Sequence, residues 1–136
     1  MAAGTHVLTA HRGAFPNAIG EVETTWVGST DNGAVPTLAV TFPYDCELES
    51  LATTISASAT AAYDITAVDA NGLDRLRGVG ADRNTTAAEE VPIVFASTSI
   101  HPVVRGGEAL TITLANNSDT SSGGKIIIRY RAIAKV

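Results

Sequence analysis

Two segments in the last third of the chain, 108–114 and 125–134, alternate between apolar and polar residues. In the second segment Ile126, Ile128 and Tyr130 share one side, and lysine and arginine residues occupy the other. A period of two is typical of a β-strand with one buried face. Residues 116–124, between the two segments, are turn formers and include no apolar side chain. This pattern predicts antiparallel β-sheet.

The same alternation recurs along most of the chain, interrupted by turn signals such as Asn32-Gly33 and Gly106-Gly107. Leu48 and Leu51 fall on opposite phases, which predicts a bend or β-bulge near Glu49-Ser50. The expected strands are 5–9, 21–27, 37–42, 47–59, 63–67, 73–77, 91–96, 101–105, 108–114 and 125–134. Many short strands at about ten-residue spacing predict an all-β, single-domain antiparallel β-sandwich or jelly roll.

The first twenty residues form a different region, because Gly and Pro interrupt them. Residues 1–20 are therefore expected to form an extended N-terminal arm, and residues 21–136 the β-sandwich domain. Four apolar side chains of the arm are predicted to anchor it on a partner: Val7, Leu8, Phe15 and Ile19. The polar segment 78–90 is a second candidate contact, or a loop that remains in solvent.

Composition excludes several classes of function. The net charge is −5 and no cluster of lysine and arginine is present, which argues against direct nucleic-acid binding. Cys46 is the one cysteine, so an intrachain disulfide and a cysteine-rich zinc site are excluded, and it is expected to pack as a small apolar residue. No signal peptide and no run of about 20 apolar residues is found. These two absences predict a soluble protein that is made in the cytoplasm and does not associate with a membrane.

Candidate chemistry is sparse. A zinc site would need the three histidines to meet, and a calcium site would need Asp64, Asp69 and Asp74 to converge rather than serve as turn residues. Glu47 and Glu49 share one phase of a strand, as paired catalytic carboxylates could, but the exposed face of a strand explains them equally well. The histidines are His6, His11 and His101. We therefore expect no enzyme, no cofactor and no metal.

Two further features are candidates for an interface. Trp26 lies in an alternating strand and is either a core residue or, if exposed, an interface anchor. Lys125, Arg129 and Arg131 form a partly basic strip on an otherwise acidic chain. That strip could meet an acidic partner surface, or it could be an ordinary solvated sheet face.

Three segments carry a resemblance to small bacteriophage virion proteins of the β-sandwich, or jelly-roll-like, class. They are an apolar strand running into Pro-aromatic-Asp at 40–48, an Asp-x-Asn-Gly hairpin at 65–72, and a Gly-Glu-x-apolar-Thr-apolar strand at 104–114. Glu108 stands where such proteins more often have Asp, and the loop 78–90 has no counterpart. The similarity spans roughly residues 37–134.

The resemblance implies a non-enzymatic structural protein of the virion. It suggests a head decoration or cement protein on the capsid surface, synthesised in the host cytoplasm, that binds and stabilises the major capsid protein, commonly as a homotrimer. The alternative is a tail-fibre or baseplate module that binds a receptor or glycan, and a small jelly-roll enzyme is a more distant one.

Overall fold

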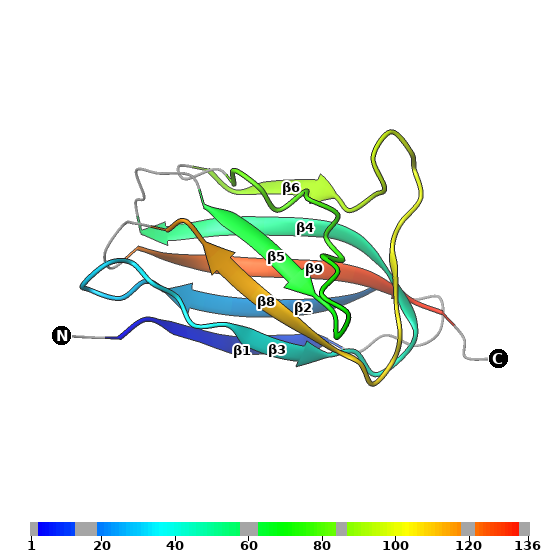
Figure 1. The fold of residues 1–136 in the computed structure, drawn as a ribbon, viewed down its shortest axis with the longest axis horizontal. Helices are drawn as coiled ribbons and strands as arrows, with labels where there is room; N and C mark the ends of the chain where they lie inside the picture. Colours follow the sequence, from blue (N-terminus) through cyan, green and yellow to red (C-terminus); the bar gives the residue numbers. More distant parts are fainter. Residues whose placement is uncertain (1–2, 13–18, 58–62, 84–86, 118–121, 134–136) are drawn as a thin grey trace.

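The computed structural model describes residues 3–12, 19–57, 63–83, 87–117 and 122–133, and within these ranges all regular structure is β-strand (Figure 1). The strands are β1 (Thr5–Arg12), β2 (Ile19–Val27), β3 (Leu38–Thr41), β4 (Cys46–Ala57), β5 (Asp64–Val68), β6 (Glu89–Pro92), β7 (Val103–Val104), β8 (Ala109–Ala115) and β9 (Gly123–Ala132). The predicted all-β fold is confirmed.

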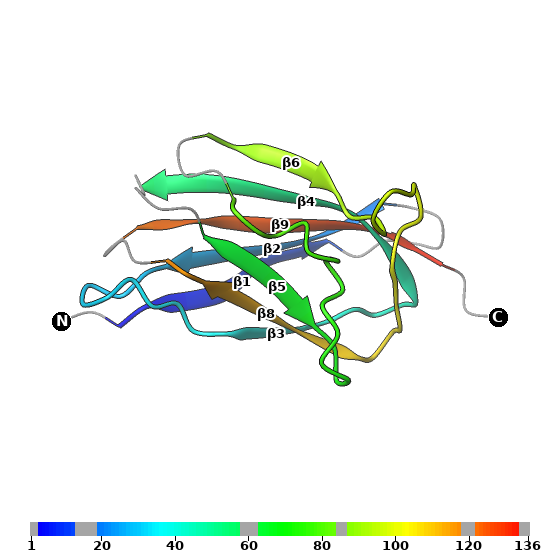
Figure 2. The ribbon, with the colours of Figure 1, turned by 45° about the horizontal axis from the view of Figure 1, so that its top comes forward.

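The strands form two antiparallel sheets that pack face to face. The larger sheet has six strands in the order β1-β2-β9-β4-β6, with the short β7 paired to the start of β4. The smaller sheet has the order β3-β8-β5, and its strands lie inclined across one face of the larger sheet (Figures 1 and 2). The two segments with the clearest alternation, β8 and β9, therefore belong to different sheets.

Alternation along the strands decides which side chains enter the core. In β9 Ile126, Ile128 and Tyr130 are fully buried, and in β8 Leu110 and Ile112 face them from the other sheet. Burying one such side chain stabilises the fold by about 1.5–3 kcal/mol. The core lies between the two sheets, where the sequence pattern placed it.

The expected β-bulge is present. The pairing of β4 with β9 shifts between Leu48 and Ser50, so that Leu48 pairs with Tyr130 and Ser50 with Arg129. Glu49 is the extra residue of the bulge. The shift returns Leu48 and Leu51 to the same buried face, because one inserted residue reverses the phase of those that follow.

The expected strand 73–77 is not formed: apart from one antiparallel bridge between Val68 and Asp74, this segment forms a series of turns that cover the free edge of β5. Asp74 explains the difference: its carboxylate accepts hydrogen bonds from the backbone N–H groups of Leu76 (3.0 Å) and Gly78 (3.0 Å), which bends the chain. The segment continues to 83 and makes backbone hydrogen bonds with both ends of β5, at Ile65 and at Ala67. The first half of the loop predicted at 78–90 is thus part of an edge cover.

Residues of the expected arm that the structure describes lie in strands. Thr5–Arg12 is β1, an edge strand of the larger sheet, and Ile19 begins β2. Phe15 lies outside the described residues. On the inner side of β1, His6 donates from Nδ1 to the carbonyl oxygen of Pro36 (3.0 Å) and accepts at Nε2 from the hydroxyl of Thr24 (2.9 Å). These bonds join β1 to the segment that leads into β3.

Candidate functional site

The larger sheet has an outer face, which we define as the side-chain face of β1, β2, β9, β4 and β6 directed away from the smaller sheet. No described element covers this face (Figures 1 and 2). Side chains of paired residues form rows that cross this face from strand to strand. Neighbours within a row come from strands that are far apart in the chain. One such row pairs Arg12 with Glu21, Glu21 with Arg129, and Arg129 with Ser50.

Charges alternate along that row, which we call the charge row: Arg12, Glu21, Arg129 and Glu90. Arg12 contacts Glu21 at 3.0 Å, and Arg129 Nε donates to the other oxygen of Glu21 at 2.9 Å. Arg129 also contacts Glu90, whose carboxylate accepts from the Ser50 hydroxyl at 2.8 Å. Together with Ser50 of β4, the charge row therefore links side chains of all five strands.

The ion pairs set the electrostatics of the face. Hydrogen bonding by Arg129 is the main reason that the pKa of Glu21 is lowered, and the same hydrogen bond raises the pKa of Arg129. The pairs remain largely solvent-exposed, with about 44% of the Glu90 side chain and 36% of the Arg129 side chain accessible. Exposed pairs of this kind contribute little to stability, about 0–1 kcal/mol each, so their chief effect is to hold the side chains in place.

The three cations expected to form a basic strip lie together on the outer face, and each has a carboxylate partner. Lys125 contacts Glu23 at 3.8 Å, and Arg131 Nε donates to Glu49 at 3.1 Å, beside the pairs of Arg129. The strip is therefore part of a mixed surface of paired charges. Each cation thus has a carboxylate neighbour before any acidic partner binds.

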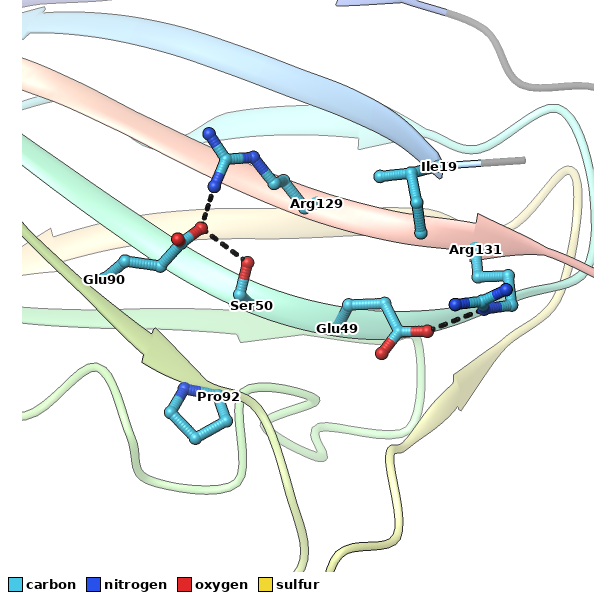
Figure 3. A pocket seen from close by; sticks show the side chains of 7 residues that line it. All are labelled: Ile19, Glu49, Ser50, Glu90, Pro92, Arg129 and Arg131. Atoms are coloured by element: carbon cyan, nitrogen blue, oxygen red, sulfur yellow. Dashed lines mark hydrogen bonds and ion pairs between the residues drawn. The ribbon is translucent and has the colours of Figure 1, made fainter. Parts of the chain in front are cut away.

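A shallow groove of about 490 Å³ crosses the face over the β-bulge (Figure 3). Because the bulge turns Glu49 and Ser50 toward the same side, both line the groove. The other lining residues are Ile19, Glu90, Pro92, Arg129 and Arg131. The groove thus presents hydrogen-bond donors and acceptors side by side, between two apolar residues.

The polar side chains that line the groove are joined by hydrogen bonds and ion pairs. The Ser50 hydroxyl donates to the carboxylate of Glu90 at 2.8 Å. Glu49 is engaged by Arg131 and by His101 Nε2 at 2.9 Å, and His101 Nδ1 contacts the carbonyl oxygen of Ile93 at 2.7 Å. These contacts fix the orientations of the Glu49 and His101 side chains.

The metal sites considered from the sequence do not assemble among the described residues, where no three potential ligands converge. Asp69 accepts from the backbone N–H groups of Asn71 and Leu73, and Asp64 accepts from the N–H of Asp82 and from Asn116. These hydrogen bonds lower the pKa values of both carboxyl groups. Asp69 therefore serves as a turn residue, whereas Asp64, the first residue of β5, binds segments that are remote in the chain.

The predicted interface residues fall into three places. Val7, Leu8 and Ile19 are each about half-exposed, but the first two lie at the β1 edge and the third lies beside Arg131 at the groove. Trp26 is fully buried against Tyr63, with ring centroids 5.4 Å apart, which is the core position that the sequence left open. Its ring has no exposed surface with which to contact a partner.

Sequence reasoning missed the carboxylates that complete the outer face, above all Glu21 and Glu90. The available signal was the alternation of β2, which places Glu21 and Glu23 opposite its buried residues. Pairing them with particular arginines required the order β2-β9-β4-β6, which joins strands that are not consecutive in the chain.

None of the known protein families, curated proteins or solved structures compared with this chain matches it. Within the residues described, no helix is long and apolar enough to cross a membrane.

Proposed function

We propose that the protein is a non-enzymatic structural protein, a head decoration or cement protein of a bacteriophage, that binds the major capsid protein through the outer face of its larger sheet. The observation that carries the proposal is the face itself: a broad surface of five strands, held in place by cross-strand ion pairs and left open by the smaller sheet. The resemblance of segments 40–48, 65–72 and 104–114 to virion sandwich proteins gives the class of partner.

The composition of the face supports binding to a protein surface. Paired charges alternate with small and apolar side chains such as Ala52, Ile127 and Ile19, so both polar and apolar contacts are available. Side chains already fixed by ion pairs lose less conformational entropy when they bind. A cement protein needs such a surface over a stable fold.

The proposal is tested by co-sedimentation with shells that lack the protein. The double variant Arg129→Glu/Arg131→Glu reverses two cations of the outer face and should reduce the bound fraction by at least tenfold. Arg105→Glu is the matched control, because Arg105 is exposed in the turn between β7 and β8 and should leave binding unchanged. Failure of the native protein to sediment with any shell would refute the proposal.

A deletion of residues 1–15 would not test binding by the N-terminal residues. It would remove β1, and with it the hydrogen bonds of His6 to Pro36 and Thr24. Loss of shell binding in that truncation would then report damage to the sheet. The homotrimer stays a prediction of the resemblance.

The groove favours a second candidate, the receptor- or glycan-binding module of a tail fibre or baseplate. Glu49, Ser50 and Arg131 place acceptors and donors within one groove, as vicinal hydroxyl groups of a sugar require. Binding on a glycan array that is abolished by Glu49→Gln, in a protein that does not sediment with shells, would favour this candidate. Trp26→Ala is unsuitable for that purpose, because Trp26 is buried.

A further inference from the structure

The two sheets present four edges, and three of them are short or covered. β3 has four residues and is followed closely by Pro43, and β6 has four residues and ends at Pro92. The edge of β5 is paired with the turns of 73–83 through backbone hydrogen bonds at Ile65 and Ala67. Short strands, prolines and covering loops are the usual means by which a folded protein prevents its edges from pairing with another chain.

The edge of β1 has few of these protections. β1 runs for eight residues, contains no proline and no acidic residue, and pairs with β2 alone among the described strands. Its one irregularity is a shift between Leu8 and Ala10, which leaves Thr5–Leu8 in regular pairing. Val7 and Leu8 are exposed, with accessible fractions of 51% and 46%. No strand among the described residues thus pairs with the outer row of N–H and C=O groups of β1, which lies beside exposed apolar side chains.

Charge separates this edge from the rest of the molecule. The chain carries a net charge of −5 with 14 acidic residues, which makes copies repel one another. The first acidic residue is Glu21, so no carboxylate lies on β1. Two copies can therefore approach at β1 without bringing carboxylates of this strand together.

We propose that β1 pairs antiparallel with β1 of a second copy, about a two-fold axis that passes through Val7. In that register Val7 faces Val7 of the other copy, His6 faces Leu8, and Thr5 faces Thr9. Residues opposite each other in a sheet must share a face. His6 and Leu8 both pair with the inner-facing Trp26 and Thr24 of β2, whereas Thr5 and Val7 pair with Val27 and Thr25 on the outer face.

Thr9 satisfies the same requirement, since its hydroxyl contacts Glu23 (3.0 Å) and Thr25 (3.1 Å), which lie on the outer face. The register covers both exposed apolar side chains and places no two like charges opposite each other. Arg12, the fully charged residue of β1, falls beyond the paired part. A second copy of this chain therefore fits the edge, and the larger sheet would continue from one copy into the other.

The first test is the mass in solution, by light scattering and sedimentation over a range of concentrations. We expect twice the 14.0 kDa of one chain at high concentration. Val7→Lys places two ammonium groups opposite each other on the axis and should return the mass to that of a monomer. Ile19→Lys, at an equally exposed apolar residue of β2, should remain dimeric. A monomer, the homotrimer that the resemblance predicts instead, or a dimer indifferent to Val7→Lys would overturn the proposal.

A second test fixes the register and does not depend on how Val7→Lys folds. Under mild oxidation Val7→Cys should form a disulfide-linked dimer, because directly opposed residues lie within the Cα distance that a disulfide spans. Thr5→Cys should not link, since its opposite residue is Thr9. Cys46 should not interfere, because it is fully buried. Linking at position 5 in preference to position 7 would overturn the register.

Discussion

The two faces of the larger sheet differ although the same strands build both. In β9 the inward residues Ile126, Ile128 and Tyr130 are fully buried, whereas Lys125, Arg129 and Arg131 point outward and form exposed ion pairs. The inner face gains its stability from removing apolar surface from water, and the outer face gains little from charges that remain hydrated. Adjacent residues of one strand thus contribute very differently to stability.

The largest expected effect is on the inner face. Ile128→Ala should lower the free energy of unfolding by about 2–5 kcal/mol, because it removes a fully buried side chain and leaves a cavity. Its neighbour Ile127, which points outward and is only partly buried, is the control and should lose clearly less when changed to Ala. Urea unfolding measures both. Equal losses would contradict the separation of the two faces.

Gly20 and Ile19, a second pair of adjacent residues on opposite faces of the sheet, test packing in β2. A Cβ atom at Gly20 would lie 2.5 Å from the ring of Tyr130, which is itself packed edge-on to Phe42 at 5.0 Å between centroids. Gly20→Ala should therefore cost about 1–3 kcal/mol through overpacking. Ile19→Ala, on the half-exposed outer position beside it, should change stability by less than about 0.5 kcal/mol. Thermal unfolding of the two variants shows whether this difference holds.

Acidification tests the inner face at β1. Burial lowers the pKa of His6, against a smaller opposing effect of its hydrogen bond to Pro36, and burial also lowers the pKa of His11. The unfolded chain takes up these protons near pH 6.5, before the folded chain does, so acidification favours unfolding. The free energy of unfolding should be highest above pH 6.5 and fall below it, by at most about 1.4 kcal/mol per pH unit for each histidine.

The variant His6→Gln assigns this pH dependence. It lacks the titrating ring, so denaturant unfolding between pH 7 and pH 5 should show a shallower decline than in the native chain. Carboxyl groups with lowered pKa values, such as Glu21 and Asp64, titrate below this pH interval. We therefore expect the pH dependence within the interval to come from the histidines. A native chain that becomes more stable on acidification through this interval would contradict the assignment.

The smallest effect is expected on the outer face. Arg129→Ala should reduce the free energy of unfolding by about 0–1 kcal/mol at low salt, and by less in 1 M salt, where the charges are screened. A double-mutant cycle with Glu21→Ala isolates the contact of 2.9 Å between the two side chains. A coupling of several kcal/mol would mean that the charge row stabilises the fold itself.

The sequence predicted the inner face better than the outer one. Period-two alternation places Leu110, Ile112 and Ile128 in a core without knowledge of their partners, because burial depends on face alone. The β-bulge at Glu49 could likewise be predicted, from the reversed phase of its neighbours. The pairing of Arg129 with Glu21 and Glu90 could not, because it depends on strand order across the sheet.

Local hydrogen bonding explains why the predicted strand at 73–77 does not form. Residues 73–77 carry the composition of a hairpin partner, yet the Asp74 carboxylate binds backbone N–H groups that a strand would need for pairing. The predicted role of Phe15 as an anchor lies outside the described residues and stays a prediction.

The central position of β9 has a consequence for how the chain reaches its native state. β2 and β4 do not pair with each other; β9 lies between them and pairs with both, although it begins at Gly123, long after β2 ends at Val27 and β4 at Ala57. During synthesis neither strand can close its inner edge until β9 has emerged. Pairing at such long separation delays folding and leaves strand edges open to other chains. We therefore expect this domain to fold slowly and to depend on β9 for solubility while it is being made.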